Sequence, residues 1–172
     1  AASGVETVAD NREAAADAAT VVLAVKPQQL RAVAEALADD LQKRRPLVIS
    51  VAAGIRSGSL QRWLGGGLPL VRAMPNTPAM VQSGATALFA TAAVSDQQRG
   101  QAESLLRAVG LTCWLEDESS MDTVTALSGS GPAYHFLVME AMEAAAIRQH
   151  TVVNGIDLYS PPSSVAFTVP VR

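Results

Sequence analysis

Long apolar runs alternate with amphipathic segments along the first half of the chain. The runs TVVLAV at 20–25, PLVISVAAG at 46–54 and LPLVRAMPNTP at 68–78 are typical of buried strands. After the first run, apolar residues recur at helical spacing, at Leu30, Val33, Ala34, Leu37 and Leu41. SGSLQRWLGGG, between the second and third runs, predicts a short helix that ends at its glycines. This order predicts an α/β fold in which residues 21–25, 47–51 and 70–73 are buried neighbours in a parallel sheet with helices on its faces.

The pattern continues with further strands and helices up to about residue 148. Residues 85–90 read as a strand, and SDQQRGQAESLLRAVG predicts a helix capped by Ser95 and ended by Gly110. LTCWLED then alternates like a strand. A helix is expected from near Asp122 to about Arg148, interrupted by SGSGP, and the stretch from Thr151 has three prolines and no helical period. We therefore expect a loop or tail after residue 150.

Composition narrows the class of protein and its partners. The chain has 172 residues, of which 49% are hydrophobic, and a net charge of -3, so it can bury one sizeable core but has no basic surface for nucleic acid. No signal peptide or membrane span is visible, so we expect no membrane partner. Cys113 is the only cysteine, which excludes a disulfide framework and favours a reducing cytoplasm. On its strand pattern Cys113 is expected to be a small buried side chain.

The ends of the three predicted parallel strands suggest a ligand site. Residues 24–27, 51–54 and 74–78 follow the strands and meet at the carboxyl edge of the sheet, where open α/β sheets bind ligands. Small residues there would let a flat ring approach the backbone, and Lys26 offers a positive charge to an anion. Any one of these turns could be an ordinary connection. Three on one edge favour a nucleotide-like cofactor.

Other chemistry has weaker support. No G-x-G-x-x-G follows a strand, and SGSGP follows a predicted helical segment, so the sequence contains no dinucleotide phosphate loop. Ser128 or Ser130 as a nucleophile would need a base and an orienting acid, but His135 and His150 are the only histidines and no elbow motif precedes them. Two histidines and one cysteine without ligand spacing do not make a metal site. A hydrolase and a metalloenzyme are therefore disfavoured.

Several motifs, in this order and spacing, resemble pyrroline-5-carboxylate reductase. They are AVKP, VAAG, RAMPNTP, VQSGATALFA, LLRAVG and, most specifically, MDTVTALSGSGPAY, and they cover Ser3 to about Arg148. The resemblance implies a Rossmann-like parallel sheet, here incomplete, as a partial NAD(P)-binding domain at 1–117. It further implies the start of an α-helical dimerisation domain at 118–150 and a tail, 151–172, that does not resemble the family. SGSGPAY would then be the junction between the two domains.

The resemblance also implies site residues and a reaction. Residues expected to contact NADPH, or NADH, are Asn11, Ala24, Val25, Lys26, Pro27, Val51, Ala52 and Ala53. Residues expected on the substrate side are Met74, Asn76, Thr77, Glu118, Ser128, Gly129, Ser130 and Gly131. The reaction would be hydride transfer to the C=N carbon of 1-pyrroline-5-carboxylate, giving L-proline in a homo-oligomer. An iminium is already electrophilic, so no catalytic acid or base is assigned.

Two departures from the family leave alternatives open. The family's first strand, glycine-rich loop and second strand should precede Ser3, and helices that carry a substrate-carboxylate loop should follow His150. We therefore expect a truncated or frame-altered product, or a partial gene model, with little or no reductase activity by itself. The alternative function is an inactive fragment that acts at most as a binding or assembly module. A different Rossmann dehydrogenase that reduces a carbonyl is a third possibility, against which SGSGPAY argues.

Overall fold

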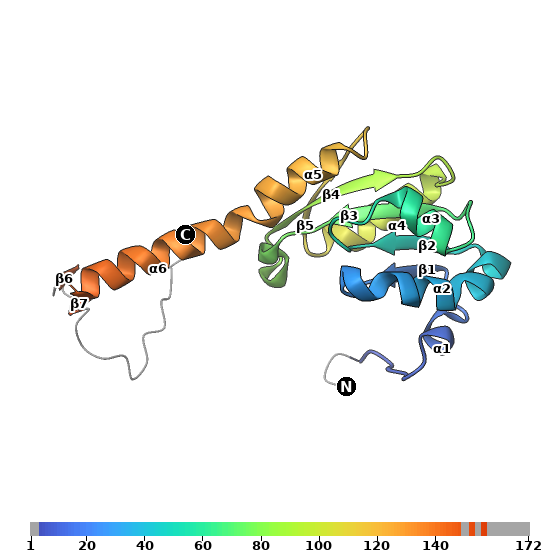
Figure 1. Ribbon diagram of the computed structural model, residues 1–172, viewed down its shortest axis with the longest axis horizontal. Helices are drawn as coiled ribbons and strands as arrows, with labels where there is room; N and C mark the ends of the chain where they lie inside the picture. Colours follow the sequence, from blue (N-terminus) through green and yellow to red (C-terminus); the bar gives the residue numbers. More distant parts are fainter. Residues whose placement is uncertain (1–3, 149–151, 154–155, 158–172) are drawn as a thin grey trace. The chain divides into compact units, whose positions relative to one another are not determined.

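The computed structural model describes residues 4–148, 152–153 and 156–157. The chain forms two compact units that divide between Gly131 and Pro132. A five-stranded sheet in the order β1-β2-β3-β4-β5 forms the centre of the first unit (Figure 1). Its strands are β1 Thr20–Leu23, β2 Leu47–Ser50, β3 Leu70–Met74, β4 Gly84–Ala90 and β5 Gly110–Trp114.

The first three strands are parallel, as predicted, but the fourth reverses direction. β1 pairs with β2 and β2 with β3 in parallel, whereas β4 is antiparallel to β3 and β5 is parallel to β4. The chain passes from β3 to β4 through a single turn of 3-10 helix, η1 Thr77–Val81. A connection this short cannot cross over the sheet to start a parallel strand, so β4 must run back. The result is a Rossmann-like α/β fold with a mixed sheet.

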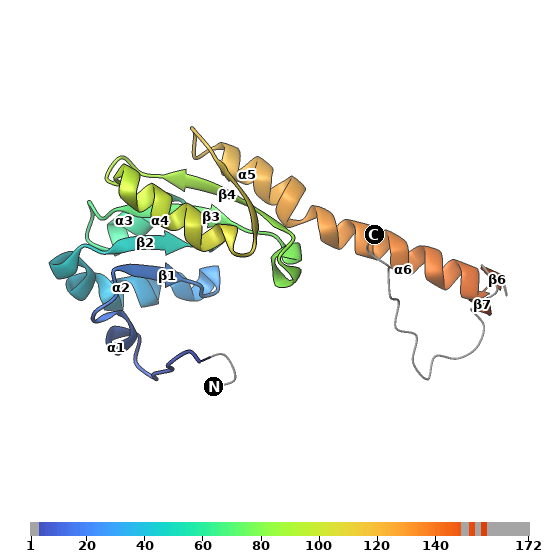
Figure 2. The ribbon, with the colours of Figure 1, turned by 180° about the vertical axis from the view of Figure 1, so that it is seen from behind.

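Helices cover both faces of the sheet (Figure 2). The helices of the first unit are α1 Asn11–Ala15, α2 Pro27–Arg44, α3 Ser57–Trp63, α4 Asp96–Arg107, α5 Ser120–Val124 and a π-helical turn, η2 Thr125–Gly129. One core cluster joins α2 and α3 to the sheet through Leu37, Leu60 and Val48. A second joins α4 to the other face through Leu106 and Ile49. Successive side chains of β2 therefore point to opposite faces of the sheet and pack into two different cores, as a sheet with both faces covered requires.

Local signals in the sequence account for the ends of the main helices. Pro27 occupies the first turn of α2, where its missing N–H costs nothing. Ser95 forms a capping box with Gln98 at the start of α4, which confirms the predicted cap. The expectation that Gly110 ends this helix is wrong, because α4 ends at Arg107 and Gly110 is the first residue of β5. There its φ of +145° suits glycine only.

Three side chains predicted to be buried are exposed instead. Val22 of β1 is 43% exposed, and Ala24, just after β1, and Cys113 of β5 are exposed as well. Among the described residues β1 and β5 each have a strand on one side only, so their side chains lack half of the neighbours that a central strand has. Apolar runs and alternation identify strands but do not tell an edge from a centre.

The second unit contains the predicted helix, α6 Gly131–Arg148. Its described apolar side chains are largely exposed, among them Phe136, Leu137 and Met142. The predicted tail is partly wrong, because β6 Val152–Val153 pairs antiparallel with β7 Ile156–Asp157. The rest of that prediction concerns positions outside the described residues. Within the described part of the chain, no helix is long and apolar enough to cross a membrane.

One buried polar group in the sheet predicts a stabilising substitution. The Thr86 side chain on β4 is 2% exposed, and its hydroxyl has no hydrogen-bond partner among the described residues. Thr86→Val keeps the shape and removes the unsatisfied group, so we expect unfolding to cost about 1 kcal/mol more in urea titrations. Thr112→Val is the matched control, because the Thr112 hydroxyl accepts from Arg107 and donates to Glu103. Equal effects of the two substitutions would contradict this account.

Candidate functional site

The ends of β1, β2 and β3 meet at one edge of the sheet, because the three strands are parallel. The connections that leave this edge are residues 24–26 after β1, 51–56 after β2 and 75–76 after β3. Lys26, at the start of α2, is exposed and makes no salt bridge among the described residues. Gly54 has a φ of +74° and turns the chain sharply after β2. The structure thus brings the three predicted connections together at the carboxyl edge.

Some of the residues predicted to contact the cofactor line a cavity of about 200 Å³. Asn11, Ala24 and Val25 line it, together with residues of β1 and α2. The remaining residues predicted for the cofactor, Lys26, Pro27, Val51, Ala52 and Ala53, do not line this cavity but follow β1 and β2 at the same edge.

Asn76 ties three segments together at the end of β3. Its Oδ1 accepts a hydrogen bond from the backbone N–H of Ala85 (2.9 Å), next to the start of β4. Its Nδ2 donates to Oγ of Ser128 in the π-helical turn (3.1 Å). A backbone N–H can only donate, so the first contact fixes which way the side-chain amide points. Thr77, the next predicted residue, is exposed at the start of η1.

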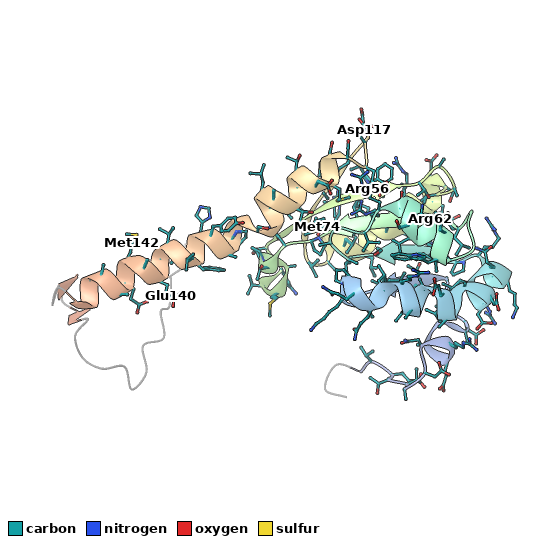
Figure 3. All side chains as sticks on the ribbon, in the orientation of Figure 1. Arg56, Arg62, Met74, Asp117, Glu140 and Met142 are labelled. Carbon is teal, nitrogen blue, oxygen red and sulfur yellow. The ribbon has the colours of Figure 1, made fainter. Side chains whose placement is uncertain are left out.

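The predicted interruption of the last helix is a π-helical turn. Ser130 donates its backbone N–H (3.0 Å) and its hydroxyl (3.2 Å) to the carbonyl of Thr125, five residues earlier. A Cβ on Gly129 would lie 2.8 Å from Cε of Met74, the last residue of β3, which Figure 3 labels. The turn therefore lies against the tip of the Met74 side chain, which would have to move to admit a Cβ. Gly131 follows as the first residue of α6.

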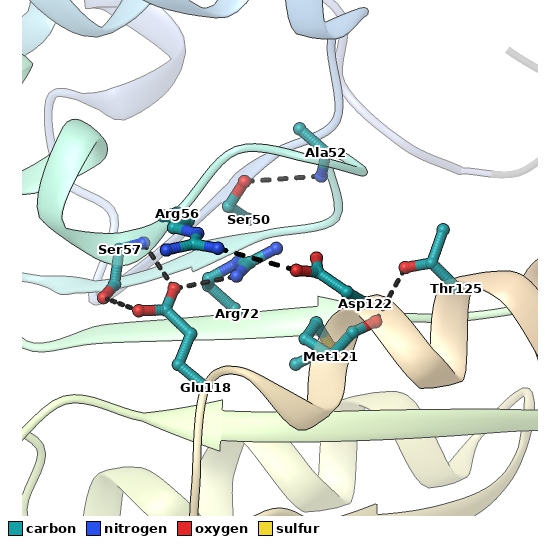
Figure 4. Close-up of polar contacts among 9 residues, drawn as sticks. All are labelled: Ser50, Ala52, Arg56, Ser57, Arg72, Glu118, Met121, Asp122 and Thr125. Atoms are coloured by element: carbon teal, nitrogen blue, oxygen red, sulfur yellow. Dashed lines mark hydrogen bonds and ion pairs between the residues drawn. The ribbon is translucent and has the colours of Figure 1, made fainter.

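Glu118 is held by contacts with Ser57 and Arg72, which the sequence does not predict (Figure 4). Its carboxylate accepts hydrogen bonds from the backbone N–H and hydroxyl of Ser57, at the start of α3, and from Nη1 of Arg72 on β3 (2.7 Å). The side chains of Arg72 and Glu118 are 5% and 23% exposed. Partial burial alone would raise the pKa of Glu118, but the hydrogen bonds from Ser57 and Arg72, with the charge of Arg72, lower it below its ordinary value.

Glu118 and Ser128 therefore anchor opposite ends of one segment. The segment between them consists of α5 and the π-helical turn η2. One end of it follows Glu118 on Arg72, and the other meets Asn76 at the carboxyl edge. Arg72 was the signal for this arrangement, since a charged residue within an apolar strand needs a partner. Among the described residues, no group of acidic, histidine and cysteine side chains could hold a metal ion.

Comparison with known proteins shows which family the chain resembles. Residues 118–152 match the family model described as pyrroline-5-carboxylate reductase dimerisation, and residues 1–54 match the one described as NADP oxidoreductase, coenzyme F420-dependent. A pyrroline-5-carboxylate reductase of Pseudomonas aeruginosa is 55% identical over 141 residues, which cover 82% of this chain and 51% of the relative. Over most of its length the chain is similar to pyrroline-5-carboxylate reductases. It spans about half the length of the curated reductases that it matches.

Solved structures of pyrroline-5-carboxylate reductases share this fold. The enzyme from Coxiella burnetii has a TM-score of 0.79 and 49% identity, over 87% of this chain and 55% of that one. The Plasmodium falciparum enzyme, solved with NADP bound, has a TM-score of 0.78 and 28% identity, over 84% of this chain and 54% of that one. These likenesses confirm the Rossmann-like fold followed by a helical dimerisation region. These matches also argue against the third sequence-based interpretation, a different Rossmann dehydrogenase that reduces a carbonyl.

Proposed function

We propose that this chain forms part of an enzyme of proline biosynthesis that reduces 1-pyrroline-5-carboxylate to L-proline with NADPH or NADH. The observation that carries the proposal is the carboxyl edge, where three parallel strands end and the SGSG turn lies against the last of them. The match of residues 118–152 to a dimerisation model supports a homo-oligomer and the predicted domain boundary near residue 118. The cytoplasm is the proposed location.

The residues at this edge fit a nicotinamide dinucleotide. Ala24 is exposed, Ala53 is half-buried, and neither has a side chain beyond Cβ, so a flat ring can approach the backbone there. Ala52, also predicted to contact the cofactor, is buried in the core beneath this edge. Lys26 is exposed and available to a phosphate, and Asn11 lies with Ala24 on the cavity beside β1. When bound, the reduced nicotinamide supplies the hydride that the C=N carbon accepts. The chain itself binds and orients the reactants, which is the main requirement for an electrophilic iminium.

The residues predicted on the substrate side have two different roles, as a wall of the site and as an anchor of the segment that carries it. Met74, Asn76 and Thr77 lie where β3 ends, and Ser128, Gly129, Ser130 and Gly131 belong to the turn and the helix start beside it. We propose that these residues form the wall against which the substrate is held. Glu118 instead acts as an anchor for the segment, because its oxygens already accept hydrogen bonds from Ser57 and Arg72.

A chimera tests the proposed function. The segment of this chain that matches the Pseudomonas aeruginosa reductase would replace the equivalent segment of that enzyme. We expect oxidation of NADPH that depends on added pyrroline-5-carboxylate, measured by absorbance. The 172-residue chain, assayed in parallel, shows whether it needs the rest of a reductase. A folded chimera that binds NADPH without turnover would favour the alternative, a binding or assembly module.

Lys26→Met in the chimera tests the cofactor edge. Hydrogen bonds to charged groups contribute roughly 1.5 to 3 kcal/mol, so we expect the KM for NADPH to rise by about tenfold or more. Because Lys26 is exposed and unpaired in the described chain, the thermal midpoint should change little. Lys43→Met is the matched control, since Lys43 is exposed and pairs only with Asp40 at the other end of α2. A similar rise in KM for both variants would remove Lys26 from the site.

A further inference from the structure

The hydrogen bond between Asn76 and Ser128 has a fixed direction. Oδ1 of Asn76 is held by the N–H of Ala85 (2.9 Å), so only the Nδ2 group of the same amide can face Ser128. Nδ2 carries hydrogens and no free lone pair, so in this contact Ser128 Oγ must accept. An amide turned the other way would place Nδ2 against the N–H of Ala85, donor against donor. The backbone therefore sets the polarity of the Ser128 contact.

A serine hydroxyl that accepts in one contact still has its own proton to donate. Among the described residues, no acceptor is placed for the Ser128 hydroxyl proton, whereas the nearby hydroxyl of Ser130 donates to the Thr125 carbonyl. Ser128 is half-buried and lies at the carboxyl edge, beside the end of β3. A hydroxyl proton in that position is available to a ligand at the edge.

We propose that Asn76 is a positioning residue that holds the Ser128 hydroxyl as a hydrogen-bond donor toward an acceptor oxygen of the bound ligand. The inference rests on the proposed function, because it takes the ligand to be a nicotinamide dinucleotide or a cyclic amino acid. Both offer an sp² oxygen, in the carboxamide of the nicotinamide or in the carboxylate of proline. Titrations with NADPH alone and with L-proline in the presence of NADPH distinguish the two sources.

Asn76→Asp reverses the polarity while keeping the contacts. One carboxylate oxygen still accepts from Ala85, but the other now accepts the Ser128 proton instead of donating to Ser128 Oγ. In the 172-residue chain we expect a thermal midpoint within a few degrees of the parent, and a loss of ligand affinity of about tenfold, followed by NMR titration. A purely structural role of Asn76 would lower the midpoint without this loss.

A double-mutant cycle separates the reversed hydroxyl from the added charge. Ser128→Ala alone is expected to lower affinity by about tenfold, because it removes the donor. Asn76→Asp added to Ser128→Ala should then cost less than about twofold, since no hydroxyl remains to be reversed. The same loss in both backgrounds would mean that the new charge acts directly on the ligand, and would overturn the inference.

A readout without ligand makes the test independent of the proposed function. In a ¹H–¹⁵N spectrum, Ser128→Ala is expected to shift the side-chain amide resonances of Asn76. Ser130→Ala, the matched control on the same turn, should leave them in place because the Ser130 hydroxyl bonds to Thr125. Unmoved Asn76 resonances in Ser128→Ala would overturn the inference. If the 172-residue chain binds neither ligand, the titrations are made with the chimera, where failure to bind either ligand would contradict the proposed function. The spectrum decides the Asn76–Ser128 contact by itself in either case.

Discussion

Gly110→Ala is expected to abolish cooperative folding of the first unit. A Cβ on Gly110 would lie 2.0 Å from the carbonyl oxygen of Gly84, its partner where β4 and β5 begin. The φ of +145° at Gly110 adds backbone strain for any other residue. Strain and overpacking together would cost about 3 kcal/mol or more, a large part of the stability of a small domain. Circular dichroism during urea titration measures the loss.

Gly100→Ala is the control for that substitution. Gly100 lies within α4, is exposed, and has nothing within 4 Å of the position that a Cβ would occupy. Alanine at such a helical position is expected to stabilise the protein by about 0.5 to 1 kcal/mol. The two changes add the same methyl group, so opposite signs assign the loss to the close approach of Gly84 and the backbone conformation of Gly110, and not to the methyl group itself. A Gly110→Ala variant as stable as the parent would contradict the close approach.

Glu118→Gln is expected to destabilise the first unit by about 3 kcal/mol. The substitution leaves the Arg72 guanidinium, 5% exposed, without its charged partner, and removing one member of a buried ion pair costs about 3 to 5 kcal/mol. We place the effect at the lower end because Glu118 is 23% exposed and partly screened. Asp122→Asn is the control, since its contact with Arg56 (3.7 Å) joins two exposed side chains and should contribute less than about 1 kcal/mol.

The same pair predicts how stability depends on pH. The pKa of Glu118 is lowered in the folded chain from an ordinary value of 4.5, so the unfolded chain takes up this proton first as the pH falls. The contribution of Glu118 is therefore complete above that value and is lost as the pH falls below it toward the folded pKa. Urea titrations between neutral and acid pH should show this decline in the parent. The Glu118→Gln variant should lack this part of the decline. If the stability of the parent and of the variant fell in parallel with pH, the assigned role of Glu118 would be wrong.

Patterns that act over a few residues were enough to predict most of the elements. The β-branched run before Lys26 and the helical spacing after it fixed β1 and α2, and with them the carboxyl edge. Pairing between distant residues was not visible in the same way. The direction of β4 follows from the length of η1, and the exposure of Cys113 from the position of β5 in the sheet. Both are properties of the assembled sheet and not of any one segment.

In the candidate site, too, local motifs predicted which residues belong together but not how they contact one another. Motif resemblance brought Asn76 and Ser128 into one set, but only coordinates show that an amide fixed by Ala85 donates to the serine. The same resemblance placed Glu118 on the substrate side. Its contacts with Ser57 and Arg72 depend on a buried charge meeting a carboxylate from a remote part of the chain. The direction of a hydrogen bond and the partner of a buried charge depend on the folded structure and cannot be predicted from the spacing of residues in the sequence.

The anchoring of the segment between Glu118 and Ser128 has a consequence for the order of folding. Its contacts close long loops, since Ser57 and Glu118 are 61 positions apart and Asn76 and Ser128 are 52 apart. Closing such loops costs chain entropy before any contact rewards it, so local pairs such as β3 with β4 form more readily. We therefore expect the contacts of Glu118 and Ser128 to form late, after the strands have paired. Weakening Glu118 should speed unfolding while leaving the refolding rate nearly unchanged, because its contacts are absent when the barrier is crossed.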